Sequence, residues 1–230
     1  MKTLKVVWWK DYNNFGDILT PVLLERLVGI KSKWAEPWDS EFMGVGSYLD
    51  GMDQYKGIVW GTGRMFPGGE TDLSKANVLA VRGQLTRDIV KTDCDVLGDP
   101  GLLCKLIAPK KVKKTHEFGM IPHWNDSEMK DIYKGDYFII DVTQDVDIVI
   151  KQVASCKNIL SSSLHGLVLA DALGIRRRWS FAPKNPGEGF KFRDYQSIFG
   201  DTIVPGIWYK ADQEVVDETV DKLLTALKTI

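Results

Sequence analysis

The sequence contains little histidine and little cysteine, with three residues of each among 230. The cysteines, Cys94, Cys104 and Cys156, are odd in number and far apart. They therefore indicate reduced, mostly structural thiols rather than a zinc or redox motif, and we expect a cytoplasmic protein. His116 and His123 have no cysteine or acidic partner at ligand spacing, so no metal site is predicted.

Long hydrophobic runs and an excess of charge are also missing. The longest apolar runs, such as YFII and GLVLA, are far shorter than the roughly 20 residues that span a bilayer. The apolar stretch near the N-terminus is too short for the core of a signal peptide. The net charge is −1, which predicts no strong attraction to nucleic acid or to an anionic membrane. We therefore expect a soluble protein.

Several common catalytic motifs are absent. The stretches GVGSYL and GTGRMF each contain Gly-x-Gly, but both lack the third glycine of the dinucleotide fingerprint, so a nicotinamide enzyme is not predicted. There is no Walker loop, no Gly-x-Ser-x-Gly elbow and no His-Glu-x-x-His motif.

Short hydrophobic runs that alternate between strand and helix patterns predict an α/β fold with parallel sheets covered on both faces. The expected strands lie at 3–9, 56–61, 76–81, 116–121, 136–142, 157–161 and 177–182. The expected helices lie at 20–29, 82–90, 144–155, 164–174 and 215–228. The lysine-rich stretch 108–114 favours two domains, 1–110 and 111–230, and the last helix is a candidate to pack back on the first. The alternative is one larger sheet in which 108–114 is a surface loop.

The junction NILSSSLHGLVLADALGI places a histidine where a strand ends and an apolar helix begins. Ligands bind at the carboxyl ends of parallel strands, and a helix N-terminus favours an anion. His165 would face that anion from the first helical turn, and Gly166 would allow a close approach. Hydroxyl donors would come from Ser161, Ser162 and Ser163. The alternative is that a serine caps the helix and His165 bonds to that serine.

Six segments, found in this order, resemble the polysaccharide pyruvyl transferase family: NNFGDILTPVLLERLVG, VWGTG, VRGQLTRD, LGDPGLL, SSSLHGLVLADALGI and FKFRDY. The resemblance implies transfer of pyruvate from phosphoenolpyruvate to a sugar, usually as a ketal across two hydroxyls. No further cofactor is implied. It also implies two Rossmann-like domains facing a cleft, similar to the glycosyltransferase B fold.

The resemblance implies site residues as well. Phosphoenolpyruvate carries a phosphate and a carboxylate, which suit the planar fork of arginine. Arg82, at the end of a buried strand, is expected to bind the donor, and Arg87 either assists or is a surface residue. Histidine exchanges protons near neutral pH, so His165 is the catalytic candidate. Asp17 acts as a base or caps its helix. Further binding residues are Asn14, Gly16 and Lys191, of which Lys191 alternatively pairs with Asp194.

Two departures from the family keep other functions open. Members often have an arginine immediately before the Leu-His pair, where this chain has Ser163, and the chain is shorter than many members. The alternatives are a nucleotide-sugar glycosyltransferase of similar fold and a non-catalytic glycan-binding member. The chain has eight tryptophans. Most are expected in the core, and a minority are expected to stack on sugar rings.

Overall fold

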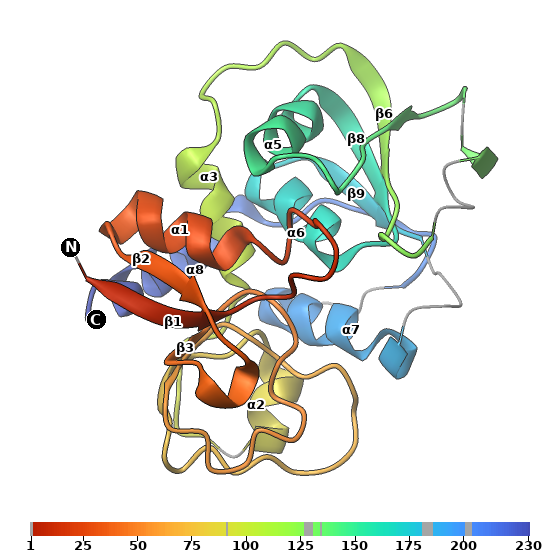
Figure 1. Cartoon of the computed structure of the whole chain (residues 1–230). Coiled ribbons are helices and arrows are strands. Elements are labelled where there is room, and N and C mark those ends of the chain that lie inside the picture. The colour runs from red at the N-terminus through yellow and green to blue at the C-terminus, as the bar shows by residue number, and fades with distance from the viewer. Residues whose placement is uncertain (1, 91, 127–130, 134, 181–185, 201–203) are drawn as a thin grey trace.

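The computed structural model describes residues 2–90, 92–126, 131–133, 135–180, 186–200 and 204–230. It contains two five-stranded sheets, one built from strands before residue 81 and the other from strands after residue 115. Both termini lie close together beside the first sheet (Figure 1). The α/β class with parallel-rich sheets is therefore confirmed.

The first sheet is wholly parallel and has the order β2-β1-β3-β4-β5. Its strands are β1 (Thr3–Val7), β2 (Lys31–Trp34), β3 (Phe42–Met43), β4 (Ile58–Trp60) and β5 (Asn77–Ala80). Helix α1 (Leu19–Val28) joins β1 to β2, the short η1 (Pro37–Asp39) lies between β2 and β3, and α2 (Gln84–Val90) follows β5. The connections from β3 to β4 and from β4 to β5 are loops.

The second sheet has the order β10-β9-β8-β6-β7, and only β10 is antiparallel to its neighbour. Its strands are β6 (His116–Ile121), β7 (Phe138–Ile139), β8 (Cys156–Ser161), β9 (Arg176–Trp179) and β10 (Trp208–Tyr209). Its helices are α5 (Val146–Ala154), α6 (Leu164–Ala172) and α7 (Phe190–Gln196), with short turns η3 (Pro186–Gly189) and η4 (Ser197–Phe199) around α7.

The remaining elements tie the two sheets together. The turn η2 (Pro100–Leu103) and α3 (Cys104–Ile107) follow the first sheet, and α8 (Gln213–Leu227) ends the chain. Helix α8 lies against the first sheet, where Trp60 Nε1 donates to the carbonyl of Leu223 at 3.0 Å. Helix α6 is buried along its whole length, as its apolar sequence predicts. One hydrophobic cluster contains side chains of both sheets.

Helix α1 begins earlier than predicted. Thr20 is a residue type favoured at N-caps, but it lies inside the helix, where its Oγ1 accepts a hydrogen bond from the Val45 N–H at 2.8 Å. The N-cap is Ile18, which makes no side-chain capping bond. The tight turn at Asn14 already winds the backbone, so the helix starts before Pro21. The predicted end is confirmed, because Gly29 is left-handed at φ 68°.

Both sheets share one strand order. Numbered from its own first strand, each sheet is ordered 2-1-3-4-5, which is a common order in doubly wound folds. Such sheets bind ligands where the order reverses, outside the carboxyl ends of the strands. The reversal lies between β1 and β3 in the first sheet and between β6 and β8 in the second. The loops after these four strands are therefore the expected place for a site.

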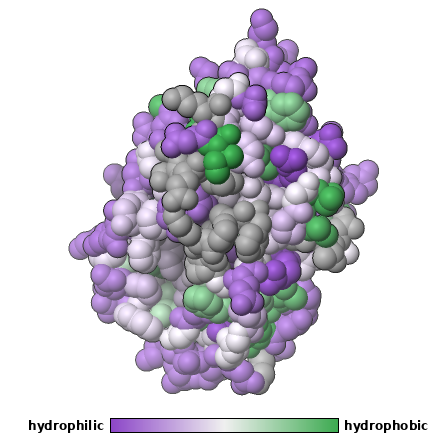
Figure 2. Space-filling model, turned by 90° about the vertical axis from the view of Figure 1, so that its right-hand side faces the viewer, coloured by the Kyte–Doolittle hydropathy of each residue, from purple (hydrophilic) through white to green (hydrophobic). Residues whose placement is uncertain are grey.

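The surface seen in Figure 2 is largely hydrophilic. Figure 2 shows one face on which hydrophilic residues predominate and hydrophobic residues form small separate groups. Within the described residues, no helix is both long enough and apolar enough to cross a bilayer.

Candidate active site

A cavity of about 600 Å³ lies where the two reversal points meet. Its wall combines loops that follow β1, β2 and β3 with loops that follow β6 and β8. The lining residues fall within 7–17, 34–37, 46–48, 123–125 and 163–165, together with Met65 and Lys191. The strand order thus brings both halves of the chain to one site.

His165 lines this cavity from the first turn of α6, as predicted, and is only 8% exposed. The alternative of a serine cap is not seen, because the N-cap Ser163 makes no side-chain capping bond. Burial lowers the pKa of His165 to about 3, and the positive charges of Lys191, Arg82 and His123 add to this effect. The ring is therefore neutral around neutral pH.

Of the three serines before α6, only Ser163 lines the cavity. The Ser161 hydroxyl bonds within its own turn, where it accepts from the Ser163 N–H at 3.0 Å. The Ser162 hydroxyl donates to Asp126 at 2.9 Å and accepts from the His123 N–H at 2.9 Å. Ser161 and Ser162 therefore hold the loop in place, and their contact with a ligand stays a prediction.

Two glycines serve close packing. A Cβ on Gly166 would lie 2.3 Å from Ser161 Oγ, so this glycine lets α6 approach the second sheet rather than admitting a ligand. A Cβ on Gly16 would lie 2.1 Å from Nδ1 of His165. Gly16 thus allows the loop after β1 to pack against the histidine ring. Asn14 lines the cavity and shapes the same loop, because its Oδ1 accepts from the Gly16 N–H at 3.1 Å.

Asp17 and Lys191 bring opposite charges to the cavity. Burial raises the pKa of Asp17 to about 7, although Lys191 and Asn14 oppose the shift. Burial also lowers the pKa of Lys191 to about 8, helped by Arg82 and opposed by Asp17 and Asp126. Asp17 does not cap α1, since the cap is Ile18. Both groups therefore titrate near neutral pH, where acid–base chemistry is most efficient.

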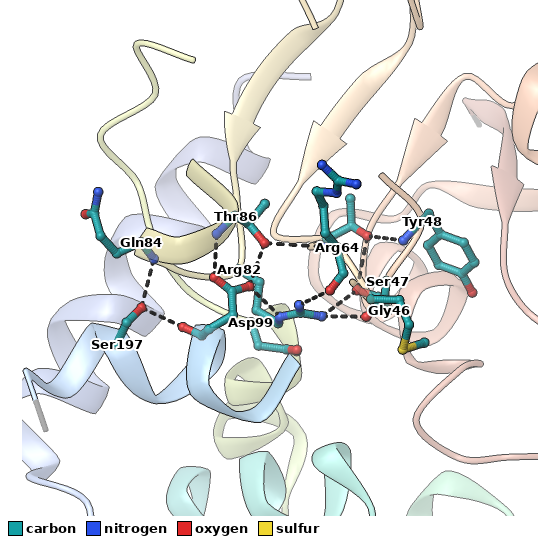
Figure 3. Close-up of polar contacts among 12 residues, drawn as sticks. Gly46, Ser47, Tyr48, Arg64, Arg82, Gln84, Thr86, Asp99 and Ser197 are labelled. Atoms are coloured by element: carbon teal, nitrogen blue, oxygen red, sulfur yellow. Dashed lines mark hydrogen bonds and ion pairs between the residues drawn. The ribbon is translucent and has the colours of Figure 1, made fainter. Parts of the chain in front are cut away.

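Arg82 is placed differently from the prediction. Its side chain is 0% exposed, and its Nε donates to Asp194 at 2.8 Å. The rest of the fork bonds Ser47 Oγ at 2.6 Å and the carbonyls of Gly46 and Arg64 (Figure 3). The guanidinium is thus enclosed by protein groups and is absent from the cavity lining, and its contact with the donor stays a prediction. Its carboxylate partner stands 112 positions away, so the neighbouring sequence could not reveal it.

The Arg82 pair fastens α7 to the start of α2. Asp194 also accepts hydrogen bonds from the N–H and the hydroxyl of Thr86, both at 2.7 Å. A Cβ on Gly83 would lie 1.8 Å from the carbonyl oxygen of Asp194, so glycine is needed for this contact. The segments VRGQLTRD and FKFRDY are therefore one packing unit. That unit fixes α7, and Lys191 one turn before Asp194 points into the cavity.

Arg87 lies outside the cavity lining and forms an ion pair with the exposed Asp95 at 3.4 Å. This placement favours the surface alternative for Arg87.

Known proteins resemble this chain over much of its length. The family model described as "Polysaccharide pyruvyl transferase" matches residues 71–179, which include Arg82 and His165. "Uncharacterized protein L143" of Acanthamoeba polyphaga mimivirus is 30% identical over 206 residues, covering 81% of this chain and 71% of that protein. "Succinoglycan biosynthesis protein ExoV" of Rhizobium meliloti (strain 1021) is 25% identical over 214 residues, covering 86% of this chain and 65% of that protein. The chain belongs to the polysaccharide pyruvyl transferase family. The resemblance carried by the six sequence segments is thus confirmed.

In this pyruvyl transferase family member, aromatic side chains form much of the cavity wall. They are Trp8, Trp9, Trp34, Tyr48 and Trp124. Trp9 and Trp124 are 48% and 37% exposed, and Tyr12 stacks on Trp124 with ring centroids 4.2 Å apart. Sequence reasoning did not separate these tryptophans from core ones such as the fully buried Trp60. The available signal was position, because Trp8 and Trp9 directly follow β1.

No three His, Cys, Asp or Glu side chains gather as potential metal ligands among the residues that the structure describes. That catalysis needs no metal stays a prediction.

Proposed function

We propose that this protein transfers pyruvate from phosphoenolpyruvate to a sugar of a glycan or glycan precursor and forms a ketal. The observation that carries the proposal is the single cavity at both reversal points, which joins the titratable groups of His165, Asp17 and Lys191 to exposed aromatic rings. Family membership and the similarity to ExoV, a protein of succinoglycan biosynthesis, support a glycan substrate.

The donor would lie at the inner end of the cavity. Lys191 offers a cation there, and the free N–H groups at the start of α6 favour an anion. Lys191 would thereby supply the charge that an arginine at position 163 often supplies in this family. An ammonium is a compact point charge, whereas arginine binds phosphate and carboxylate with a planar fork. Donor contacts in this chain would accordingly rely more on backbone N–H groups.

Ketal formation requires the transfer of two protons and the release of inorganic phosphate. The methylene carbon of phosphoenolpyruvate gains a proton, and two sugar hydroxyl oxygens form bonds to the neighbouring carbon as the bond to the phosphate oxygen breaks. Two hydroxyl protons are released in exchange. One balances the proton gained by the methylene carbon, and the other leaves with inorganic phosphate. His165 and Asp17 are the groups that exchange these protons, because both line the cavity. Among the described residues, Asp17 forms no ion pair and His165 approaches only Asp99, at 3.9 Å.

The acceptor would lie toward the aromatic mouth. Trp9 and Trp124 expose large flat surfaces beside the cavity. Such rings suit a pyranose, because the apolar face of the sugar stacks on the ring while its hydroxyls remain free for polar contacts. Tyr12 stacks on Trp124 and so fixes the position of that ring.

Phosphoenolpyruvate is expected to raise the melting temperature, because a ligand that binds only the folded state stabilises it by about 2.7 kcal/mol at a hundredfold excess over Kd. The measurement is a thermal-shift titration with phosphoenolpyruvate and, in parallel, nucleotide sugars. A shift with nucleotide sugars and none with phosphoenolpyruvate would instead indicate a glycosyltransferase. A shift with glycans alone would indicate a binding protein.

Replacing Lys191 with methionine is expected to weaken phosphoenolpyruvate binding by about tenfold or more, because a charge-assisted contact contributes about 1.5–3 kcal/mol. Calorimetry measures this affinity, with Lys157→Met as the control. Lys157 is an exposed lysine paired with Glu117, outside the cavity lining. A folded Lys191→Met protein that binds phosphoenolpyruvate like the wild type would remove Lys191 from the donor site.

A further inference from the structure

Two buried polar atoms face each other behind the catalytic candidate. Within the part of the chain that the structure describes, neither Asp99 Oδ2 nor His165 Nε2 has a hydrogen-bond partner, and the two atoms lie 3.9 Å apart. Asp99 is 0% exposed. Buried polar atoms are nearly always satisfied, so two orphaned atoms that face each other call for an explanation. One proton placed between them, with a small closing movement, satisfies both.

The Asp99 carboxylate is held so that Oδ2 stays directed toward His165. Its other oxygen, Oδ1, accepts from the Gly101 N–H at 2.8 Å and caps η2. Turn η2 packs on α6, where a Cβ on Gly101 would lie 3.0 Å from Val168. The carboxylate and the helix that carries His165 thus form one rigid contact.

The other edge of the ring faces the loop after β1. Nδ1 is the His165 atom nearest to Gly16, while Nε2 is turned away into the protein. Because Nε2 is buried on the side of Asp99 and His165 lines the cavity, a ligand would approach the ring from the Nδ1 edge, beside Gly16.

We propose that Asp99 is a positioning residue that keeps the hydrogen of His165 on Nε2, so that Nδ1 presents a lone pair to the cavity and accepts a proton from the sugar hydroxyl. The role of Nδ1 as a base toward the sugar rests on the proposed function, whereas the position of the hydrogen on Nε2 does not. An aspartate before proline is typical of a turn, and the bond of Asp99 Oδ1 to Gly101 agrees with that role, whereas Oδ2 is left to orient His165.

The surrounding charges decide which group holds the proton. Lys191, Arg82 and His123 face His165 and oppose a second proton on its ring. Burial raises the pKa of Asp99 to about 6, while Arg82 lowers it and Asp194 raises it. Above that pH the carboxylate is ionised and can only accept a hydrogen bond, so the neutral imidazole donates from Nε2. An anionic donor in the cavity would offset the cations and make Nδ1 a stronger base.

Asp99→Asn tests the proposal with little change of shape. The amide oxygen can still accept from Gly101, and the amide N–H₂ then faces Nε2, so a neutral His165 must accept at Nε2 and carry its hydrogen on Nδ1. Nitrogen-15 NMR of the imidazole distinguishes the two tautomers, with His116→Asn and His123→Asn used to assign the signals. We expect Nε2–H in the wild type and Nδ1–H in Asp99→Asn.

Turnover of Asp99→Asn is expected to fall by about tenfold or more with a smaller change in KM for phosphoenolpyruvate, because the tautomer is wrong while the binding groups remain. Wild-type turnover should also fall as the pH drops through about 6, where Asp99 becomes protonated and the base is lost. This decrease in turnover at low pH should be absent from Asp99→Asn. The exposed Asp95→Asn is the control.

An Nδ1–H tautomer in the wild type overturns the proposal and requires no variant to fold. An unchanged tautomer, or unchanged turnover, in a folded Asp99→Asn protein also overturns it. If the tautomer switches as expected while neither protein transfers pyruvate, the positioning role stands and the proposed function fails.

Discussion

Replacing His165 with alanine is expected to lower turnover by about 100- to 10,000-fold, the range typical of a lost general acid or base. The ring stands in the first turn of α6 and lines the cavity, with no side-chain bond inside the helix. The rest of α6 remains buried among apolar side chains, so we expect the fold to persist. Burial of the ring is lost, and a modest decrease in the free energy of unfolding should accompany the kinetic effect.

The measurement is initial rates of phosphate release with a saturating sugar acceptor, and circular dichroism reports folding. His116→Ala is the matched control. His116 stacks on Phe138 at a centroid distance of 3.9 Å, at the far end of the strand that leads to the cavity. Unchanged turnover in a folded His165→Ala protein would return His165 to a structural role.

Much of the fold was predictable because its signals are local. The apolar runs of β1, β4, β6 and β8 and the periodic patterns of α5 and α8 identify these elements without knowledge of the tertiary structure. Strand β2 was not predicted because its sequence, KSKW, has three polar residues in a row, and its residues alternate between exposed and half-buried. Strands β3 and β10 have two residues each, too few to show a period. Helix α7 was missed because tertiary contacts, rather than propensity, order FKFRDY.

The site was predictable to the extent that it is one strand-to-helix junction. His165 stands out because β8 ends and α6 begins beside it, and parallel sheets bind ligands at such ends. The expectation for Arg82 used the same rule, but its strand ends at a packing contact with α7 instead of at the cavity. Only the folded chain brings Asp194 to Arg82 and Asp99 to His165, and no local pattern encodes either pair.

The second large effect concerns the buried ion pair of Arg82 and Asp194. Arg82→Ala is expected to lower the free energy of unfolding by about 3–5 kcal/mol, because it leaves the buried carboxylate of Asp194 without its charge partner. Asp194→Asn should lose a similar amount, since it removes the charge that Arg82 pairs with and weakens the bonds to Thr86. The two effects should not add, because each variant breaks the same network.

Urea unfolding measures these losses, and the double variant closes the cycle. The control is Arg87→Ala in the neighbouring helix α2, whose exposed pair with Asp95 is worth about 0–1 kcal/mol. Because the network fixes α7 and Lys191, phosphoenolpyruvate binding should weaken in Arg82→Lys and Asp194→Asn alike. If Arg82→Lys binds the donor about tenfold more weakly at normal stability while Asp194→Asn binds it like the wild type, Arg82 contacts the donor itself. The enclosed placement of its fork would then not persist in the donor complex.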